Sequence, residues 1–207
     1  MRFARAVGVI AALVVIAPFA RADGVYFSES FGVSLPRGEI ATYLAQPLHV
    51  RLAAGVKWRF LAIEPFISSD MQLDREGAIR GLLGGEPAAG TSDLSSYGID
   101  AKVVGKIDRV LSAYVRAGTS RVDANGALRG YAGWGVGASG GVVISGRVRA
   151  LGFLWAPLFF VKRGPMVTGA LFLDQGVELY RLRMTGSPSI TAPVGHVCVG
   201  FALGSDF

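Results

Sequence analysis

The residues with the greatest chemical potential are two histidines and a nearby serine. His49 opens one segment of alternating side chains, and His196 lies in another near the end of the chain. If both segments are strands of a closed sheet, the histidines lie about 10 Å apart, with the strand of Ser34 between them. A serine beside a histidine suits ester or lipid hydrolysis, but no carboxylate is positioned to orient either ring. The prediction is therefore no catalytic residue, only polar side chains at a rim.

Metal and thiol chemistry have little support. Cys198 is the only cysteine, so neither a disulfide within the chain nor a paired-cysteine zinc site can form. His196, Cys198 and Asp206 share one face of the last segment, but they spread over about 33 Å of extended chain. We therefore expect no metal and no cofactor, with Cys198 as a small packing residue.

Charged side chains of both signs recur on one face of the alternating segments. They are Arg51, Lys57, Glu64, Asp70, Asp100, Lys102 and Arg116. Such a set can pair inside a closed barrel, so we predict a lumen charge network. Eight strands leave little room for water and ten leave some. The prediction is a plugged lumen, with a narrow porin-like channel for small solutes as the alternative.

The segments that must position these residues repeat with period two, which is typical of half-buried strands. Tight turns are expected at 59–61, 106–109 and 144–147, and longer polar loops at 35–46 and 73–95. Asn125-Gly126 is a hairpin signal. Short turns at one end and long loops at the other are typical of outer-membrane barrels.

The strand count depends on the region after Val148. Residues 148–161 can form one strand and 194–207 the last strand. If residues 166–184 form a long outer loop, the barrel has eight strands; a hairpin around Gln175-Gly176 would give ten. The predicted fold is an all-β, up-and-down antiparallel transmembrane β-barrel of eight strands, with ten as the alternative.

Alternation alone does not say which face is inside, and a soluble lipocalin-like barrel would reverse the faces. Gly133, Gly135 and Gly137 leave one face bare, which suits a narrow lumen. Aromatic residues expected near strand ends suit interfacial girdles: Tyr26, Trp58, Phe60, Tyr97 and Trp155. Glu29 is in phase with the apolar residues of its strand, so a bulge or a rim position is expected there.

The first 22 residues have the pattern of a secretory signal peptide. Arg2 and Arg5 precede the apolar stretch 6–19, and Ala20-Arg21-Ala22 offers a cleavage site. The apolar stretch is shorter than the roughly 20 residues that span a bilayer. We expect cleavage after Ala22 and one barrel domain over 23–207. Removing three arginines lowers the formal charge from +6 to +3, which does not favour nucleic acid as a partner.

Three stretches resemble the small outer-membrane β-barrel proteins related to the OmpA transmembrane domain and the opacity-type porins. They are "GVKWRFLAIEPFIS", "GYAGWGVGASGGVV" and the terminal strand ending on Phe207, within residues 24–150 and 194–207. The resemblance implies a Gram-negative outer membrane, contact with its lipids and lipopolysaccharide, help from periplasmic chaperones, and a monomer. It also implies an assembly signal for the barrel-assembly machinery, carried by Val199, Phe201, Leu203 and Phe207.

The expected function is non-enzymatic: structural support of the outer membrane, or surface interaction through the loops. The alternatives are the narrow channel, an outer-membrane lipid-modifying hydrolase and a soluble lipocalin-like carrier.

Overall fold

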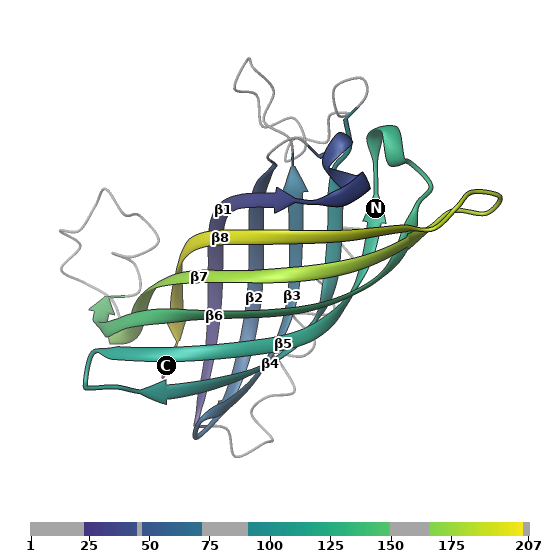
Figure 1. Ribbon diagram of the computed structural model, residues 1–207. Coiled ribbons are helices and arrows are strands. Elements are labelled where there is room, and N and C mark those ends of the chain that lie inside the picture. The colour runs from purple at the N-terminus through teal and green to yellow at the C-terminus, as the bar shows by residue number, and fades with distance from the viewer. Residues whose placement is uncertain (1–22, 45–46, 72–90, 150–165, 205–207) are drawn as a thin grey trace.

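The computed structural model describes residues 23–44, 47–71, 91–149 and 166–204. Eight antiparallel strands close into one barrel in chain order (Figure 1). The strands are β1 (Gly24–Pro36), β2 (Leu48–Trp58), β3 (Leu61–Met71), β4 (Leu94–Lys106), β5 (Leu111–Ala124), β6 (Ala132–Arg149), β7 (Met166–Arg183) and β8 (Ile190–Gly204). The predicted eight-stranded up-and-down barrel is confirmed.

Two short 3-10 helices, η2 (Gly38–Thr42) and η3 (Gly126–Leu128), lie in the connections after β1 and β5. Within the described ranges, no helix is long and apolar enough to cross a bilayer.

The register of the strands sets their tilt. Hydrogen-bonded partners followed once around the barrel from Val25 lead back to Leu35, ten residues further along β1. The partners in between are Val56, Ile63, Ala101, Ala117, Ala138, Val177 and Gly195. A stagger of ten residues over eight strands inclines each strand by about 40° to the barrel axis.

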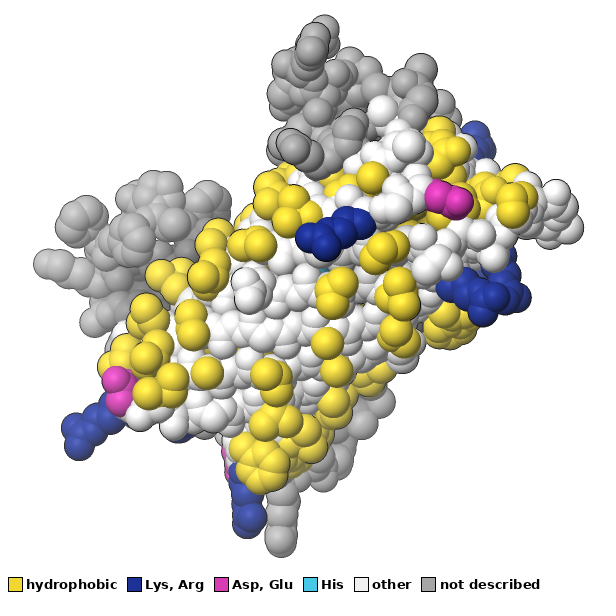
Figure 2. Space-filling model, viewed as in Figure 1, with side chains coloured by type: hydrophobic (Ala, Val, Ile, Leu, Met, Phe, Trp, Pro, Cys, Tyr) yellow, Lys and Arg dark blue, Asp and Glu magenta, His cyan; other side chains and the backbone are white. Residues whose placement is uncertain are grey.

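The outer face of the barrel is apolar. Outward residues of β1, such as Phe27, Phe31 and Val33, are exposed, and so are Val199 on β8 and Leu171 on β7. Figure 2 shows hydrophobic side chains spread over this face, with charged side chains few and mostly toward the ends. At the tilt derived above, the outward row from Val25 to Leu35 rises about 25 Å along the barrel axis. That height equals the apolar band of transmembrane barrels, about 25 Å.

Glu29 lies in the middle of this outward row, between Leu52 on β2 and Phe201 on β8. The register runs without interruption from Gly24 to Val33 on the β2 side. Neither the bulge nor the rim position expected for Glu29 is therefore present, and a carboxylate stands within the apolar band.

β6 differs from expectation. The turn predicted at 144–147 is wrong, because β6 continues through these residues to Arg149. Every residue from Ala132 to Arg149 has a register partner on β7, and most of them also have one on β5. The ladder with β7, which runs through Ser145 and Gly146, overrides their local preference for a turn.

β7 also differs from expectation. Residues 166–184 form neither a long loop nor a hairpin, because β7 passes straight through Gln175-Gly176. Gly176 faces the lumen, where an added Cβ would collide with Ser139 and the ring of His196. The glycine therefore provides space rather than a turn. The strand expected at 148–161 lies mostly outside the described residues, with Val148 and Arg149 ending β6, and the last strand begins at Ile190 rather than Val194.

The connections follow from these bounds. At one end lie the tight turns 59–60 and 107–110, together with the connection 150–165 between β6 and β7. The other end has the connections 37–47, 72–93, 125–131 and 184–189, so the short turns are not all at one end. In the turn 107–110 the backbone N–H groups of Val110 and Leu111 donate to Asp108, which lowers the pKa of that carboxyl below its usual value.

The glycine face of β6 makes room for bulky residues on β7. A Cβ at Gly135 would collide with the ring of Tyr180, and one at Gly137 would press on the side chain of Glu178. Tyr180 is 1% exposed and packs in the interior of the barrel. Bare positions on one strand thus allow large side chains on the next.

We predict that Gly135→Ala lowers the free energy of unfolding by about 1–3 kcal/mol, because the Tyr180 ring must move in a packed interior. Gly146→Ala is the matched control on the same strand, since nothing lies within 4 Å of a Cβ built there. Urea unfolding of both variants, followed by tryptophan fluorescence, measures the difference. Equal stability of the two variants would contradict the packing argument.

Candidate functional site in the barrel lumen

The inward faces of the strands bring charged residues together in the lumen. We call six of them the lumen network: Arg51 on β2, Glu64 on β3, Asp100 and Lys102 on β4, Arg116 on β5 and Asp174 on β7. Period-two alternation points each of these side chains inward, and the register places them at similar depth. All are buried except Lys102, which is partly buried. The site is therefore assembled from five strands.

Glu64 lies at the centre of one half of the network. Its Oε1 accepts a hydrogen bond from Lys102 Nζ at 2.9 Å and another from the Tyr26 hydroxyl. Its Oε2 lies 3.8 Å from Arg116 Nη1 and 4.0 Å from Arg51 Nη2. Three cations thus surround one carboxylate that is 1% exposed.

Arg116 connects this carboxylate to two others. Its Nη2 donates to Asp174 Oδ2, and its Nε lies 3.6 Å from Asp100 Oδ2. The same Nε donates to Ser139 Oγ at 2.6 Å. Arg51 completes the set, with its Nη2 2.6 Å from Asp100 Oδ2. Three cations and three carboxylates give the lumen network no net charge.

Aromatic rings cover the cations where carboxylates do not. The Arg51 Cζ lies 3.7 Å from the ring centroid of Phe66, and Lys102 Nζ lies 4.5 Å from that of Tyr114. Such contacts stabilise partly desolvated cations. The cavity among Arg51, Arg116, Glu178 and His196 has room for about one water molecule.

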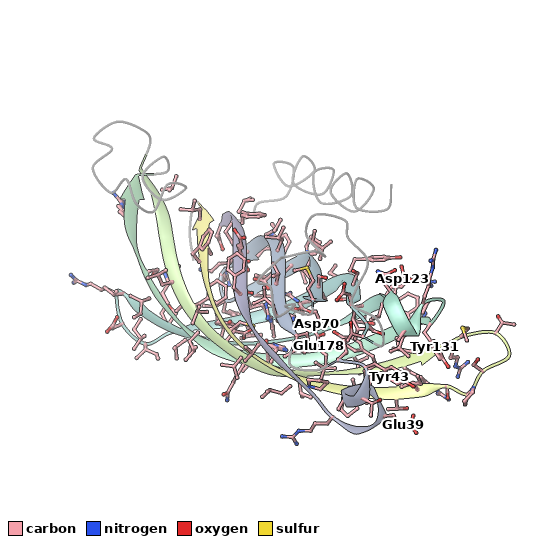
Figure 3. The ribbon with its side chains drawn as sticks, turned by 90° about the horizontal axis from the view of Figure 1, so that it is seen from above. Glu39, Tyr43, Asp70, Asp123, Tyr131 and Glu178 are labelled. Carbon is pink, nitrogen blue, oxygen red and sulfur yellow. The ribbon has the colours of Figure 1, made fainter. Side chains whose placement is uncertain are left out.

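A second polar group lies nearer the end of the barrel that carries η2. Its members are His49, Asp70, Ser34, His196 and Glu178, which we call the histidine cluster. His49 Nδ1 is 2.8 Å from Asp70 Oδ1, and the Ser34 hydroxyl donates to the same oxygen. Glu178 and His196 line the same small cavity. Asp70 and Glu178 lie together inside the barrel (Figure 3).

The histidines are closer together than expected. Their rings are stacked, with centroids 5.1 Å apart and planes at 8°, whereas two strand spacings predicted about 10 Å. The strand between them is β1, and its inward residue opposite His49 is Gly32. A Cβ at Gly32 would meet Cys198, whereas the glycine that leaves space for the His196 ring is Gly176 on β7. His196 Nε2 also lies 3.6 Å from Asp174 Oδ2, which joins the histidine cluster to the lumen network.

The expectation that no carboxylate orients a histidine was wrong, because Asp70 contacts His49 directly. Ser34 nevertheless bonds the carboxylate and not an imidazole. Ser34 is fully buried, and His49 and Asp70 are 2% and 3% exposed. Nucleophilic catalysis needs a serine hydroxyl that donates to a histidine and reaches a substrate. This arrangement fits a structural hydrogen-bond group better than a catalytic triad.

Two apolar clusters lie at the ends of the polar interior. The upper cluster combines residues of η2, the loops and the ends of β4, β5, β7 and β8, including Ile40, Leu44, Leu128, Tyr180 and Leu182. Tyr43 and Tyr131 pack against this cluster and lie toward the same end of the barrel (Figure 3). The lower cluster joins Tyr114, Val143, Ala170 and Ala202, with Val104 and Phe172 packed against it.

The seven residues predicted for the lumen are divided among these groups. Arg51, Glu64, Asp100, Lys102 and Arg116 lie in the lumen network, and Asp70 lies in the histidine cluster. Lys57 is inward and 2% exposed, near the opposite end of β2. The sequence reasoning placed Tyr26 in an aromatic girdle, which is wrong: it is 4% exposed and bonds Glu64 in the lumen.

Sequence reasoning missed Asp174, Glu178 and Tyr114 as members of the site. Asp174 and Glu178 were missed because residues 166–184 were not recognised as a strand. The signal was present, since Leu171, Leu173, Val177 and Leu179 alternate with the inward residues. Tyr114 was placed on the correct face, but no role followed from that position.

Among the described residues, no three His, Cys, Asp or Glu side chains are arranged to hold a metal ion. Cys198 is buried beside Gly32. Of the predicted assembly signal, Val199, Phe201 and Leu203 lie on the outward face of β8, and Phe207 is outside the described residues.

A closed eight-stranded antiparallel barrel with an apolar exterior and a charged interior is the fold of the small outer-membrane β-barrel proteins. Neisserial surface protein A has this fold, with a TM-score of 0.54 and 12% identity over 86% of this chain and 96% of its own. Ail, the attachment invasion locus protein of Yersinia pestis, is less similar, with a TM-score of 0.46 and 11% identity over 87% of this chain and 97% of its own. No family model and no curated protein sequence matches the chain.

We predict that Glu64→Gln lowers the free energy of unfolding by about 3–5 kcal/mol, because it leaves buried cations without their carboxylate. Removing one of those cations as well, in the double variant Glu64→Gln with Lys102→Met, should restore part of the loss. Urea unfolding of the barrel in lipid vesicles measures both. Glu39→Gln is the control, since Glu39 is an exposed carboxylate on η2. If Glu64→Gln and Glu39→Gln lowered the free energy of unfolding by similarly small amounts, the stabilising role of Glu64 in the lumen network would be contradicted.

Proposed function

We propose that the chain is an integral outer-membrane β-barrel with a non-conducting lumen, whose role is structural or in surface interaction rather than catalysis. The observation that carries the proposal is the charge-balanced lumen network between two apolar clusters. A path for ions needs continuous polar surface and water. Here the polar lumen network is filled by paired charges and has apolar clusters on either side of it.

Membrane insertion is supported by the distribution of polarity. The outward row of β1 has the height of the apolar band of transmembrane barrels, and the lumen network places six charged side chains inside, which reverses the pattern of a water-soluble barrel. A soluble lipocalin-like carrier would also need an interior cavity for its ligand. The cavity among Arg51, Arg116, Glu178 and His196 has room for about one water molecule.

Export and assembly remain part of the proposal. The pattern of residues 1–22 supports a signal peptide cleaved after Ala22, and those residues lie outside the described ranges. The outward position of Val199, Phe201 and Leu203 on β8, the strand that closes the barrel against β1, suits the assembly signal proposed for this strand.

A surface role is the favoured physiological function. Neisserial surface protein A is named as a surface protein, and it shares the fold of this chain. Four connections lie at the end of the barrel with the upper cluster, and loops carry recognition in rigid scaffolds more often than strands do. A lipid-modifying hydrolase is disfavoured by the buried Ser34, whose hydroxyl bonds Asp70.

We predict that Glu29→Leu raises the free energy of unfolding in a bilayer by about 1–2 kcal/mol, because a carboxylate facing hydrocarbon is unfavourable. Glu39→Leu outside the apolar band should give no gain. Urea unfolding from vesicles of fixed lipid composition measures both changes. If Glu29→Leu left stability unchanged or the protein were recovered native without detergent, membrane insertion through this face would be wrong.

We also predict no conductance steps from the wild-type barrel in planar bilayers, because the lumen network and the apolar clusters leave no aqueous path. A triple variant with Glu64, Arg116 and Asp174 changed to Ala is the positive control and should produce small steps. Reproducible unit steps from the wild type would favour the narrow-channel alternative.

A further inference from the structure

We propose that Arg121, Trp134 and Arg181 form a binding site for the phosphate groups of an outer-leaflet lipid of the lipopolysaccharide class. The inference rests on the proposed membrane insertion. The three residues come from β5, β6 and β7, and their register makes them direct neighbours: Arg121 pairs with Trp134, and Trp134 pairs with Arg181. All three point outward and are exposed.

The position of this trio along the strands is the boundary of the apolar band. The row next to it toward the membrane centre contains Val136 and Leu179, both exposed on the outer face. The row on the other side contains Asp123, Ala132 and the exposed Arg183. Lipid headgroups meet a barrel at this transition from apolar to polar side chains.

Trp134 is suited to this depth. Its side chain is 62% exposed and stands between the two arginines. An indole ring prefers the membrane–water interface, because its body is apolar and its N–H donates a hydrogen bond. The register neighbours of Trp134, Arg121 and Arg181, are therefore at the level of the headgroups as well.

The two arginines are available to an anion. Neither Arg121 nor Arg181 forms an ion pair with any residue that the structure describes. Two strand spacings separate their backbones by about 10 Å. Guanidinium groups bind phosphate through two parallel hydrogen bonds. Two such groups on either side of an interfacial indole match two phosphate groups on one lipid, or on two adjacent lipids.

The test uses the full folded barrel in neutral detergent, with binding of lipid A followed by native mass spectrometry. The probes are bisphosphorylated lipid A and its dephosphorylated form with the same acyl chains. Arg121→Gln with Arg181→Gln should weaken binding of the phosphorylated form about 25-fold, roughly fivefold for each arginine at a charged membrane surface. Binding of the dephosphorylated form should be weak and unchanged.

Two matched variants separate this site from general electrostatics. Arg59→Gln with Arg109→Gln removes the same charge from exposed arginines in the tight turns at the opposite end, and should not change binding. Arg121→Lys with Arg181→Lys keeps the charge but loses the paired hydrogen bonds, so it should weaken binding by less than the Gln variant does.

The site would be overturned if both double Gln variants lost the same affinity for phosphorylated lipid A. It would also be overturned if Arg121→Gln with Arg181→Gln left that affinity unchanged. Full competition by inorganic phosphate at low concentration would show a site for the free ion rather than for a lipid. Flotation with vesicles distinguishes the two proposals: a barrel that does not float contradicts membrane insertion itself, whereas one that floats and binds regardless of Arg121 and Arg181 contradicts only the lipid site.

Discussion

A charge enclosed in a narrow barrel must have its counter-charge within reach, and the rest of this structure depends on that constraint. Removing an ion from water costs several kcal/mol unless a partner and hydrogen bonds compensate. Glu64 and Arg116 meet the requirement together, because each contacts ions that come from other strands. The lumen network therefore links β2, β3, β4, β5 and β7 through side chains as well as through backbone ladders.

This constraint also fixes the register. A slip of one residue on any strand would turn its charges toward the apolar exterior and its apolar residues inward. The cost would be greatest for β4, which carries two members of the lumen network, and for β5. The Arg116 side chain on β5 pairs with Glu64, Asp100 and Asp174. Charge pairing and the apolar band thus favour the same alignment, and consistency between two independent requirements is what gives a sequence one structure.

Much of this architecture could be predicted from alternation, and the failures have local causes. The faces of β2 to β5 followed directly, because charged and apolar residues alternate over most of each strand. The failures were the turn at 144–147 and the unassigned residues 166–184. Ser145-Gly146 and Gln175-Gly176 look like turns, yet at Gly176 the glycine makes room for the His196 ring. That reason becomes visible only when β7 and β8 are side by side.

Tyr26 illustrates a second limit. An aromatic near the start of a strand fits an interfacial girdle, but its parity with Ser28 and Ser30 directs it inward, to Glu64. The position of the His196 ring depends on an absent side chain, that of Gly176 on the neighbouring strand β7. The contact of Asp70 with His49 depended on the pairing of β2 with β3. Contacts across three strands depend on the stagger of the closed barrel. The alternation within one strand does not reveal the size of that stagger.

Closure of the upper end does not depend equally on all loops. The β1–β2 connection contributes Ile40 and Leu44 to the upper cluster, both almost fully buried, and η2 contacts β8. The β5–β6 connection contributes Leu128 from η3. The connection 184–189 contributes no residue to the upper cluster. Substitutions in that connection therefore leave the upper cluster intact, whereas substitutions at the buried residues of the β1–β2 connection alter it.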